Sequence, residues 1–147
     1  MVYEGQEFHG VAKKARIVSD IIGYGPMPEP TDDAEQRLTI TTDGRVWLSC
    51  YAYGDGAKYV LQGQHRFRFT TEVTQVLLEA IGRYFGNDPI VEMATDAGTW
   101  SLEITNTEGD RFVYYGSLVE DRTGLSNFVR KALNLPNLWI FDGGITQ

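Results

Sequence analysis

Hydrophobic and polar residues alternate along most of this chain, in short runs separated by glycine, proline, asparagine and aspartate. The clearest run covers residues 99–105, where Trp100, Leu102 and Ile104 alternate with polar side chains. Because successive side chains of a strand point to opposite faces, this pattern predicts a strand with one face in the core and one in water. Residues 91–93 and 111–115 predict a strand on either side of it, so the region indicates a three-stranded antiparallel meander.

A second pair of alternating runs, residues 38–42 and 45–53, is separated by Asp43 and Gly44. An Asp-Gly pair between two strands is typical of a hairpin closed by a type I′ turn. The side chains of the second run fall into two sets, Val46, Leu48 and Cys50 on one face and Trp47, Ser49, Tyr51 and Tyr53 on the other. The aliphatic set predicts the core face of this strand.

The remaining strands are predicted at residues 12–22, 59–61, 65–69 and 138–141, the last a short apolar strand paired within the sheet. The glycines and prolines between residues 23 and 33 predict a loop. Residues 1–10 show no period, and we expect them to lie loosely on the surface.

Two segments have the three- and four-residue spacing of one helical face. In residues 71–85 the apolar stripe consists of Val73, Val76, Leu77, Ala80, Ile81 and Tyr84. Thr70 or Thr71 can cap this helix, and Gly86 ends it. Residues 125–133 form a second, shorter stripe from Leu125, Phe128, Val129, Ala132 and Leu133.

Strands in runs with separate helices predict an α+β fold, here as a single domain over residues 1–147. We expect an antiparallel sheet of about six to eight short strands, with the helices at 71–85 and 125–133 packed on one face. The opposite face then carries an aromatic group made of Trp47, Tyr51, Tyr53 and Tyr115. Whether that face is exposed or covered by a second core is left open by the pattern.

Composition narrows the classes of function. The net charge is −7, which argues against non-specific binding of nucleic acid, because such binding needs a basic surface. The single cysteine, Cys50, excludes an internal disulfide and fits a reducing, cytoplasmic setting. The chain begins without a signal-peptide pattern, and its apolar runs fall far short of the roughly 20 residues that cross a bilayer. We therefore expect neither a membrane nor direct nucleic acid as a partner.

Little in the sequence indicates catalysis, a metal or a cofactor. The two histidines, His9 and His65, are far apart in the sequence, and zinc sites need several ligands at short spacing. Cys50 with His65 would make a nucleophile and a base, but Cys50 shares a face with aliphatic residues, which favours an inert thiol. The alternative enzyme hypothesis pairs His65 with a loop carboxylate, Asp96, as acid–base groups on a small substrate.

Aromatic residues give the remaining signal, since Trp47, Tyr51, Tyr53 and Tyr59 lie close together in the sequence and Tyr115 joins them on the predicted face. Tyrosine and tryptophan favour interfaces, because they combine large contact area with a polar group. The first hypothesis is therefore a non-catalytic binding or protein-interaction module that uses this face or an edge strand, with another protein or a second copy as partner. A third hypothesis, an acidic accessory or anti-defence protein of a mobile element, rests on size and charge alone.

Overall fold

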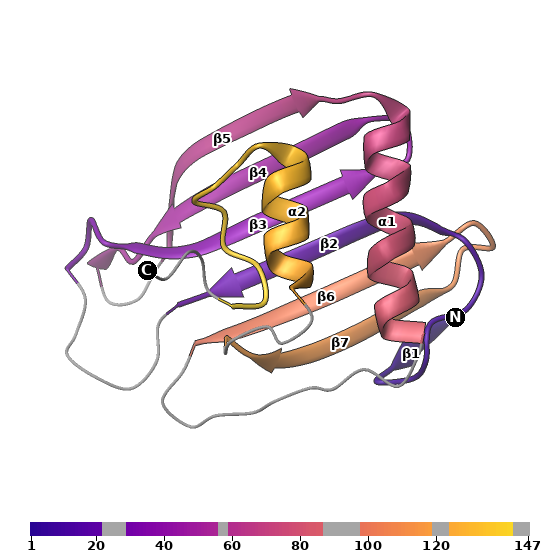
Figure 1. Cartoon of the computed structure of the whole chain (residues 1–147). Coiled ribbons are helices and arrows are strands. Elements are labelled where there is room, and N and C mark those ends of the chain that lie inside the picture. The colour runs from indigo at the N-terminus through magenta and orange to yellow at the C-terminus, as the bar shows by residue number, and fades with distance from the viewer. Residues whose placement is uncertain (22–28, 56–58, 87–97, 119–123, 143–147) are drawn as a thin grey trace.

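A computed structural model describes residues 1–21, 29–55, 59–86, 98–118 and 124–142 of the chain. The elements in chain order are β1 (Val2–Glu4), β2 (Ala12–Asp20), β3 (Asp33–Thr41), β4 (Arg45–Ala52), β5 (Val60–Arg68), α1 (Thr71–Gly86), β6 (Thr99–Asn106), β7 (Arg111–Ser117) and α2 (Leu125–Leu133) (Figure 1).

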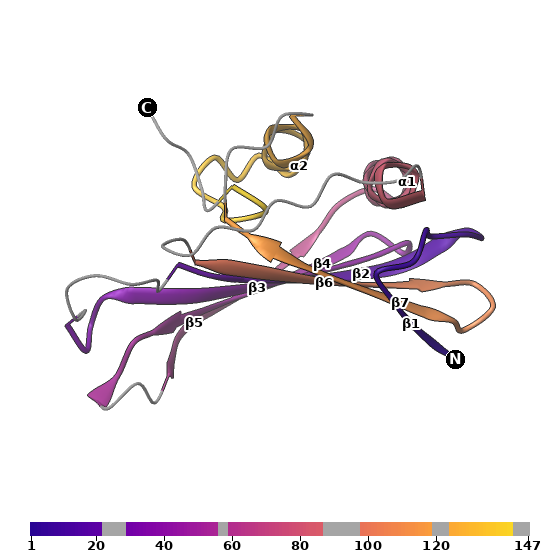
Figure 2. The same cartoon turned by 90° about the horizontal axis from the view of Figure 1, so that it is seen from below.

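The strands form one seven-stranded sheet in the order β1-β7-β6-β2-β3-β4-β5. All neighbouring pairs are antiparallel except β1 and β7. Figure 2 shows α1 and α2 side by side on the same face of the sheet. The predicted α+β fold, with an antiparallel sheet and two helices on one face, is confirmed. No helix in the described part of the chain is long and apolar enough to cross a bilayer.

The core lies between the sheet and the helices, and the register of the strands builds it in layers. Alternate residues of the central strands point toward the helices, and these are the fully buried ones: Ala15, Ile17, Leu38, Ile40, Val46, Leu102, Ile104 and Phe112. The helices contribute Leu77, Leu78, Ile81, Phe85, Val129 and Leu133. Burying a large aliphatic or aromatic side chain stabilises the fold by about 1.5–3 kcal/mol before the entropy cost, so this one-sided pattern determines which face carries the helices.

Helix α1 begins where predicted, because the Thr70 hydroxyl accepts a hydrogen bond from the Val73 amide at 3.3 Å. Its buried face is rotated from the predicted stripe, however: Val76 is 49% exposed, while Thr74 and Gly82 are buried. The ring of Phe8 lies close above Gly82, where an added Cβ would be 3.0 Å from Cε2 of that ring. The absence of a side chain at Gly82 therefore allows the helix to pack closely against the N-terminal segment.

The turn at Asp43-Gly44 differs from the predicted type I′ turn. Gly44 alone has a positive φ, 91°, and its amide donates to the Thr41 carbonyl at 3.3 Å. This is the geometry of a type I turn followed by one left-handed residue. The carboxylate of Asp43 accepts hydrogen bonds from the Thr41 hydroxyl and the Arg45 amide, which holds the first turn residues in a right-handed conformation.

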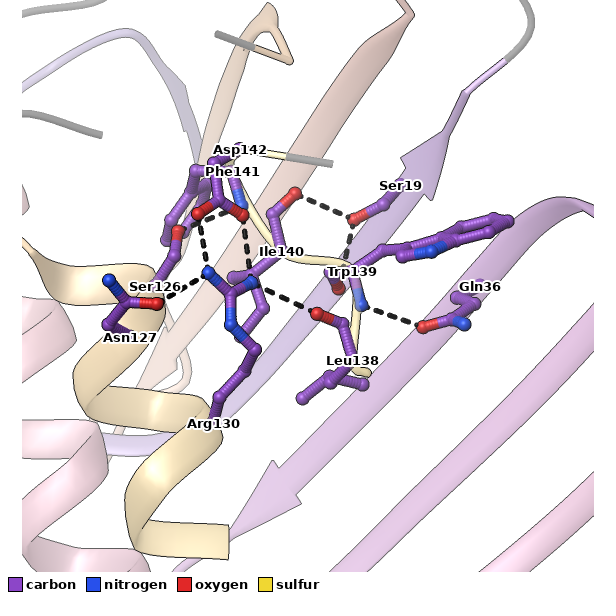
Figure 3. A network of polar contacts seen from close by, with 10 residues as sticks. All are labelled: Ser19, Gln36, Ser126, Asn127, Arg130, Leu138, Trp139, Ile140, Phe141 and Asp142. Atoms are coloured by element: carbon purple, nitrogen blue, oxygen red, sulfur yellow. Dashed lines mark hydrogen bonds and ion pairs between the residues drawn. The ribbon is translucent and has the colours of Figure 1, made fainter. Parts of the chain in front are cut away.

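Two terminal segments also differ from expectation. Residues 1–10 do not lie loosely, because Val2–Glu4 pair with β7, and Phe8 is 9% exposed with its ring against Phe112. Residues 138–141 do not form a strand in the sheet. They lie across its helix-covered face, where the Ser19 hydroxyl donates to the Ile140 carbonyl at 3.0 Å and the Trp139 amide donates to Gln36 at 2.9 Å (Figure 3).

Two further strand predictions have different outcomes. The runs at 59–61 and 65–69 merge into one strand, β5, because β5 continues past a register shift opposite Cys50 and Tyr51. The strand predicted at 91–93 lies outside the described residues.

Candidate binding face

The candidate site is the face of the sheet that points away from α1 and α2, and we call it the open face. Successive side chains of a strand point to opposite faces, so a residue between two core residues of the same strand points to the open face. Directly paired residues of neighbouring strands point to the same side, so the register places the side chains of the open face in rows that cross the sheet. No helix or strand among the described residues covers this face (Figure 2).

Four rows cross strands β7, β6, β2, β3, β4 and β5 in that order. The first row is Arg111, Thr105, Lys14, Thr41, Arg45 and Arg68. The second is Val113, Glu103, Arg16, Thr39, Trp47 and Arg66. The third is Tyr115, Ser101, Val18, Arg37, Ser49 and Gln64. The fourth is Ser117, Thr99, Asp20, Glu35, Tyr51 and Leu61.

Charge is strongly segregated on these rows. The first two rows, which we call the basic end, contain six Lys and Arg residues and one acid, Glu103. The fourth row, the acidic end, contains Asp20 and Glu35 and no basic residue. The open face is thus net positive, although the whole chain carries −7. A positive surface attracts negatively charged partners at short range, even where the chain as a whole is negative.

Several cations of the basic end have no anionic partner among the residues that the structure describes. Arg45 pairs with Asp43 at 3.2 Å and Arg111 with Glu103 at 3.8 Å, and all four side chains are well exposed. Within the described ranges, no carboxylate lies within ion-pair distance of the other four cations, which are Lys14, Arg16, Arg66 and Arg68. Arg45 and Arg68 both contribute to lowering the pKa of Asp43, after the hydrogen bond from Thr41.

Three of the five predicted aromatic residues are members of the rows of the open face. Trp47 is half-buried at the basic end, directly opposite Arg66. Tyr51 lies under Arg37, whose guanidinium carbon is 4.4 Å from the ring centroid in a cation–π contact. Tyr115 is 58% exposed and lines a shallow hollow of about 340 Å³ beside Val18.

The other two predicted aromatics are not members of the four rows. Tyr53 is 8% exposed, so it is part of the buried interior. The Tyr59 hydroxyl donates at 2.8 Å to the carboxylate of Asp20, a residue of the acidic end, so the Tyr59 side chain lies at the border of the open face. Burial together with this bond raises the pKa of Tyr59. The aromatic cluster of the sequence is therefore divided, because β4 ends at Ala52 and the period-two alternation ends with it.

The acid–base residues are not brought together by anything the structure describes. His65 is an exposed residue of the edge strand β5, on the helix side, stacked on Phe67 with ring centroids 6.3 Å apart. Asp96 lies outside the described residues. Cys50 is half-buried, and desolvation followed by the charge of Asp33 raises the pKa of its thiol, which disfavours the reactive thiolate. The described residues include no group of three metal-ligating side chains.

A groove of about 730 Å³ runs between α1 and the segment before β2. Its walls include Phe8, His9 and Leu78, and its charged residues, Glu79 and Arg83, are paired with each other at 2.5 Å. The His9 ring packs edge-on against Phe112 at 4.9 Å. The charged pair and the histidine of this groove thus already have partners within the protein, which makes it a weaker candidate site than the open face.

The charge of the open face is the feature that sequence reasoning missed. The sequence nevertheless contains a pattern that indicates this charge. Basic residues are spaced two apart at Lys14 and Arg16 and again at Arg66 and Arg68, which places each pair on one face of its strand. A count of net charge hides this pattern. The chain matches no protein-family model, and no curated protein matches it in sequence.

Proposed function

We propose that this protein is a non-catalytic binding module and that the open face is its binding surface. The observation that carries this proposal is the group of basic side chains around Trp47, on a sheet face that no described helix or strand covers. Binding surfaces of this kind combine aromatic contact area with charged groups that orient the partner.

The composition of the face argues against a second core. A core would have to bury Lys14, Arg16 and Arg66, and burying a charged group without a partner costs several kcal/mol. The helix-covered face of the same strands shows the contrast, since its central positions are aliphatic or aromatic. The two faces thus have different roles, one for packing and the other for contact with water and a partner.

The edge strand β5 is a less favourable surface for self-association. Val60 and Leu61 are 56% and 50% exposed near its start, which would favour strand pairing. Arg66 and Arg68 follow along the same strand, and a register shift occurs opposite Cys50 and Tyr51. Charges and irregularities of this kind protect edges against pairing.

Site-specific photo-crosslinking tests the proposal, because it captures a partner of any chemical class. Benzoylphenylalanine replaces Trp47 or Tyr115 on the open face, and in a matched control it replaces Phe128, a 42% exposed aromatic residue of α2. The full chain is irradiated in lysate of its source cells. We expect adducts from the two open-face positions, lost when unlabelled wild-type protein competes, and none from the control position.

Equal adducts at all three positions, or none at positions 47 and 115, would contradict the proposal. Circular dichroism on each variant verifies that the chain is folded before irradiation. A doubled mass at the open-face positions would identify a second copy as the partner and keep the surface assignment.

A further inference from the structure

We propose that the partner of the open face is single-stranded nucleic acid, bound across the basic end of the sheet. This inference rests on the proposed function and names the class of ligand for the same surface. It reverses the expectation drawn from net charge, because the relevant quantity is the charge of the face and not that of the chain.

Charge complementarity is the first argument. Neighbouring strands lie about 4.8 Å apart, so the first row extends over roughly 24 Å, and its basic residues stand on β7, β2, β4 and β5. Arg16 and Arg66 add two cations in the second row. A chain of regularly spaced phosphates can meet such a row along its whole length, whereas a single small anion uses only one or two of these groups.

The kinds of side chain present are the second argument. Five of the six cations at the basic end are arginines, whose planar group pairs with phosphate through two hydrogen bonds and stacks on bases. Trp47 lies among them and presents a ring on which an unpaired base can stack. The threonines at positions 39 and 105 supply hydroxyls between the cations, which can donate to phosphate or base oxygens.

The shape of the face favours a single strand over a duplex. The basic end is an open sheet surface without a protruding helix or loop among its residues, and the bases of a duplex are stacked inside and cannot reach Trp47. An extended single strand can lay phosphates along the first row and turn a base onto the second.

An acidic polypeptide fits the same surface less well. The backbones of the inner strands are already paired on both sides, so a peptide cannot add a strand there. The hollow beside Tyr115 is bordered by Asp20 and Glu35, which repel an acidic chain. Two acids, Asp43 and Glu103, lie at the basic end, and each pairs with one arginine there. Charges more than about 8 Å away are largely screened at physiological salt.

Fluorescence anisotropy with the full chain tests the inference. The probes are labelled oligo-dT and oligo-U of about 15 nucleotides, a labelled duplex of the same length and a labelled polyglutamate of equal charge. The variant Arg16→Gln with Arg66→Gln removes two cations beside Trp47. The matched control, Arg83→Gln with Lys131→Gln, removes the same charge from the helix side.

We expect saturable binding of a single strand that weakens steeply with salt. The open-face double variant should weaken it at least about tenfold and lower the salt slope by about 1.4, since each phosphate contact of a single strand contributes about 0.7, while the control changes it less than about twofold. Trp47→Ala should weaken binding about tenfold and Trp47→Phe should retain most of it, since stacking needs only an aromatic ring.

Three results would overturn the inference: no saturable binding of either single strand at low salt, equal losses in the two double variants, or polyglutamate binding as tight as that of the single strands. Tighter binding of the duplex would overturn the single-strand assignment. The crosslinking experiment distinguishes the loss of the nucleic-acid inference from the loss of the proposed binding function. Adducts at position 47 that resist nuclease and contain peptides of another polypeptide would keep the binding surface and reject nucleic acid.

Discussion

Asp142 and Arg130 form a buried, two-pronged ion pair that joins the C-terminal segment to α2. The distances are 2.5 Å between Nη2 and Oδ2 and 2.8 Å between Nη1 and Oδ1, and the Arg130 side chain is only 4% exposed (Figure 3). The same guanidinium donates to the Leu138 carbonyl and to Asn127, at 3.0 Å and 2.8 Å. This cation therefore determines the path of the chain after α2 across the sheet.

Asp142→Ala is expected to destabilise the protein by about 3–5 kcal/mol, because it leaves the Arg130 charge buried and uncompensated. Urea unfolding followed by circular dichroism measures the change. The matched control is Glu79→Ala, which breaks the exposed pair with Arg83 on α1 and should cost less than about 1 kcal/mol. Equal losses in the two variants would show that the buried pair does not anchor the segment.

Gly116→Ala is expected to destabilise the fold by about 1–3 kcal/mol through overpacking. A Cβ at this position would lie 2.5 Å from the Trp100 ring, which cannot move away freely because it is 7% exposed and packs on Phe141 at 4.8 Å. Gly63→Ala is the control, since its added Cβ would meet its nearest neighbour, His65, at 3.4 Å. A thermal melt that ranks the two variants equally would contradict this account.

Stability should fall at alkaline pH partly through Tyr114. Its hydroxyl donates to the Gln6 carbonyl at 2.6 Å, and desolvation, followed by the charge of Glu7, raises its pKa from 10.0 to about 12. The folded state therefore holds this proton more tightly than the unfolded state. The resulting stability is complete below pH 10 and is lost as the pH rises through about 12.

Tyr114→Phe isolates this contribution, because other tyrosines and lysines titrate in the same range. The difference in unfolding free energy between wild type and variant should shrink as the pH rises from 9 toward 12. A difference that stays constant would show that the Tyr114 hydroxyl does not titrate differently in the two states.

The open face should tolerate truncations that the core does not. Trp47→Ala and Tyr115→Ala are expected to keep a cooperative melt and to lose at most about 1–1.5 kcal/mol each, since neither side chain is fully buried. Phe112→Ala, at a 1% exposed core position of β7, should cost about 3–5 kcal/mol. Unfolding of the Trp47 and Tyr115 variants would indicate that this face is packed against something, and would contradict the proposed function.

The sequence pattern predicts a helix or strand correctly where residues close together in the chain determine that element. The two helices and the strands around Asp43-Gly44 follow from periodicity and from the residues that end each run. The predicted type of the hairpin turn is wrong, since a type I′ turn needs two residues at positive φ and only Gly44 adopts one. The hydrogen bonds that the Asp43 carboxylate accepts favour the alternative turn.

The segments whose predicted structure is wrong depend on contacts far along the chain. Val2–Glu4 form a strand only because β7 offers an edge, and nothing in the first ten residues shows that edge. Residues 138–141 are apolar enough for a strand, yet Ser19 and Gln36 bind their backbone on top of the sheet. A buried arginine on α2 completes that arrangement, and its partner is 12 residues away.

The fold class follows from the amino-acid pattern alone, because alternation every two residues and recurrence every three or four are local consequences of strand and helix geometry. The pattern also determines which side chains share a face, since that follows from counting along one strand. The order of the strands in the sheet depends on tertiary packing, and this order brings Arg111, Lys14, Arg45 and Arg68 into one row. Charge on a surface depends on distances between strands, and those distances are fixed by long-range packing that no local pattern specifies.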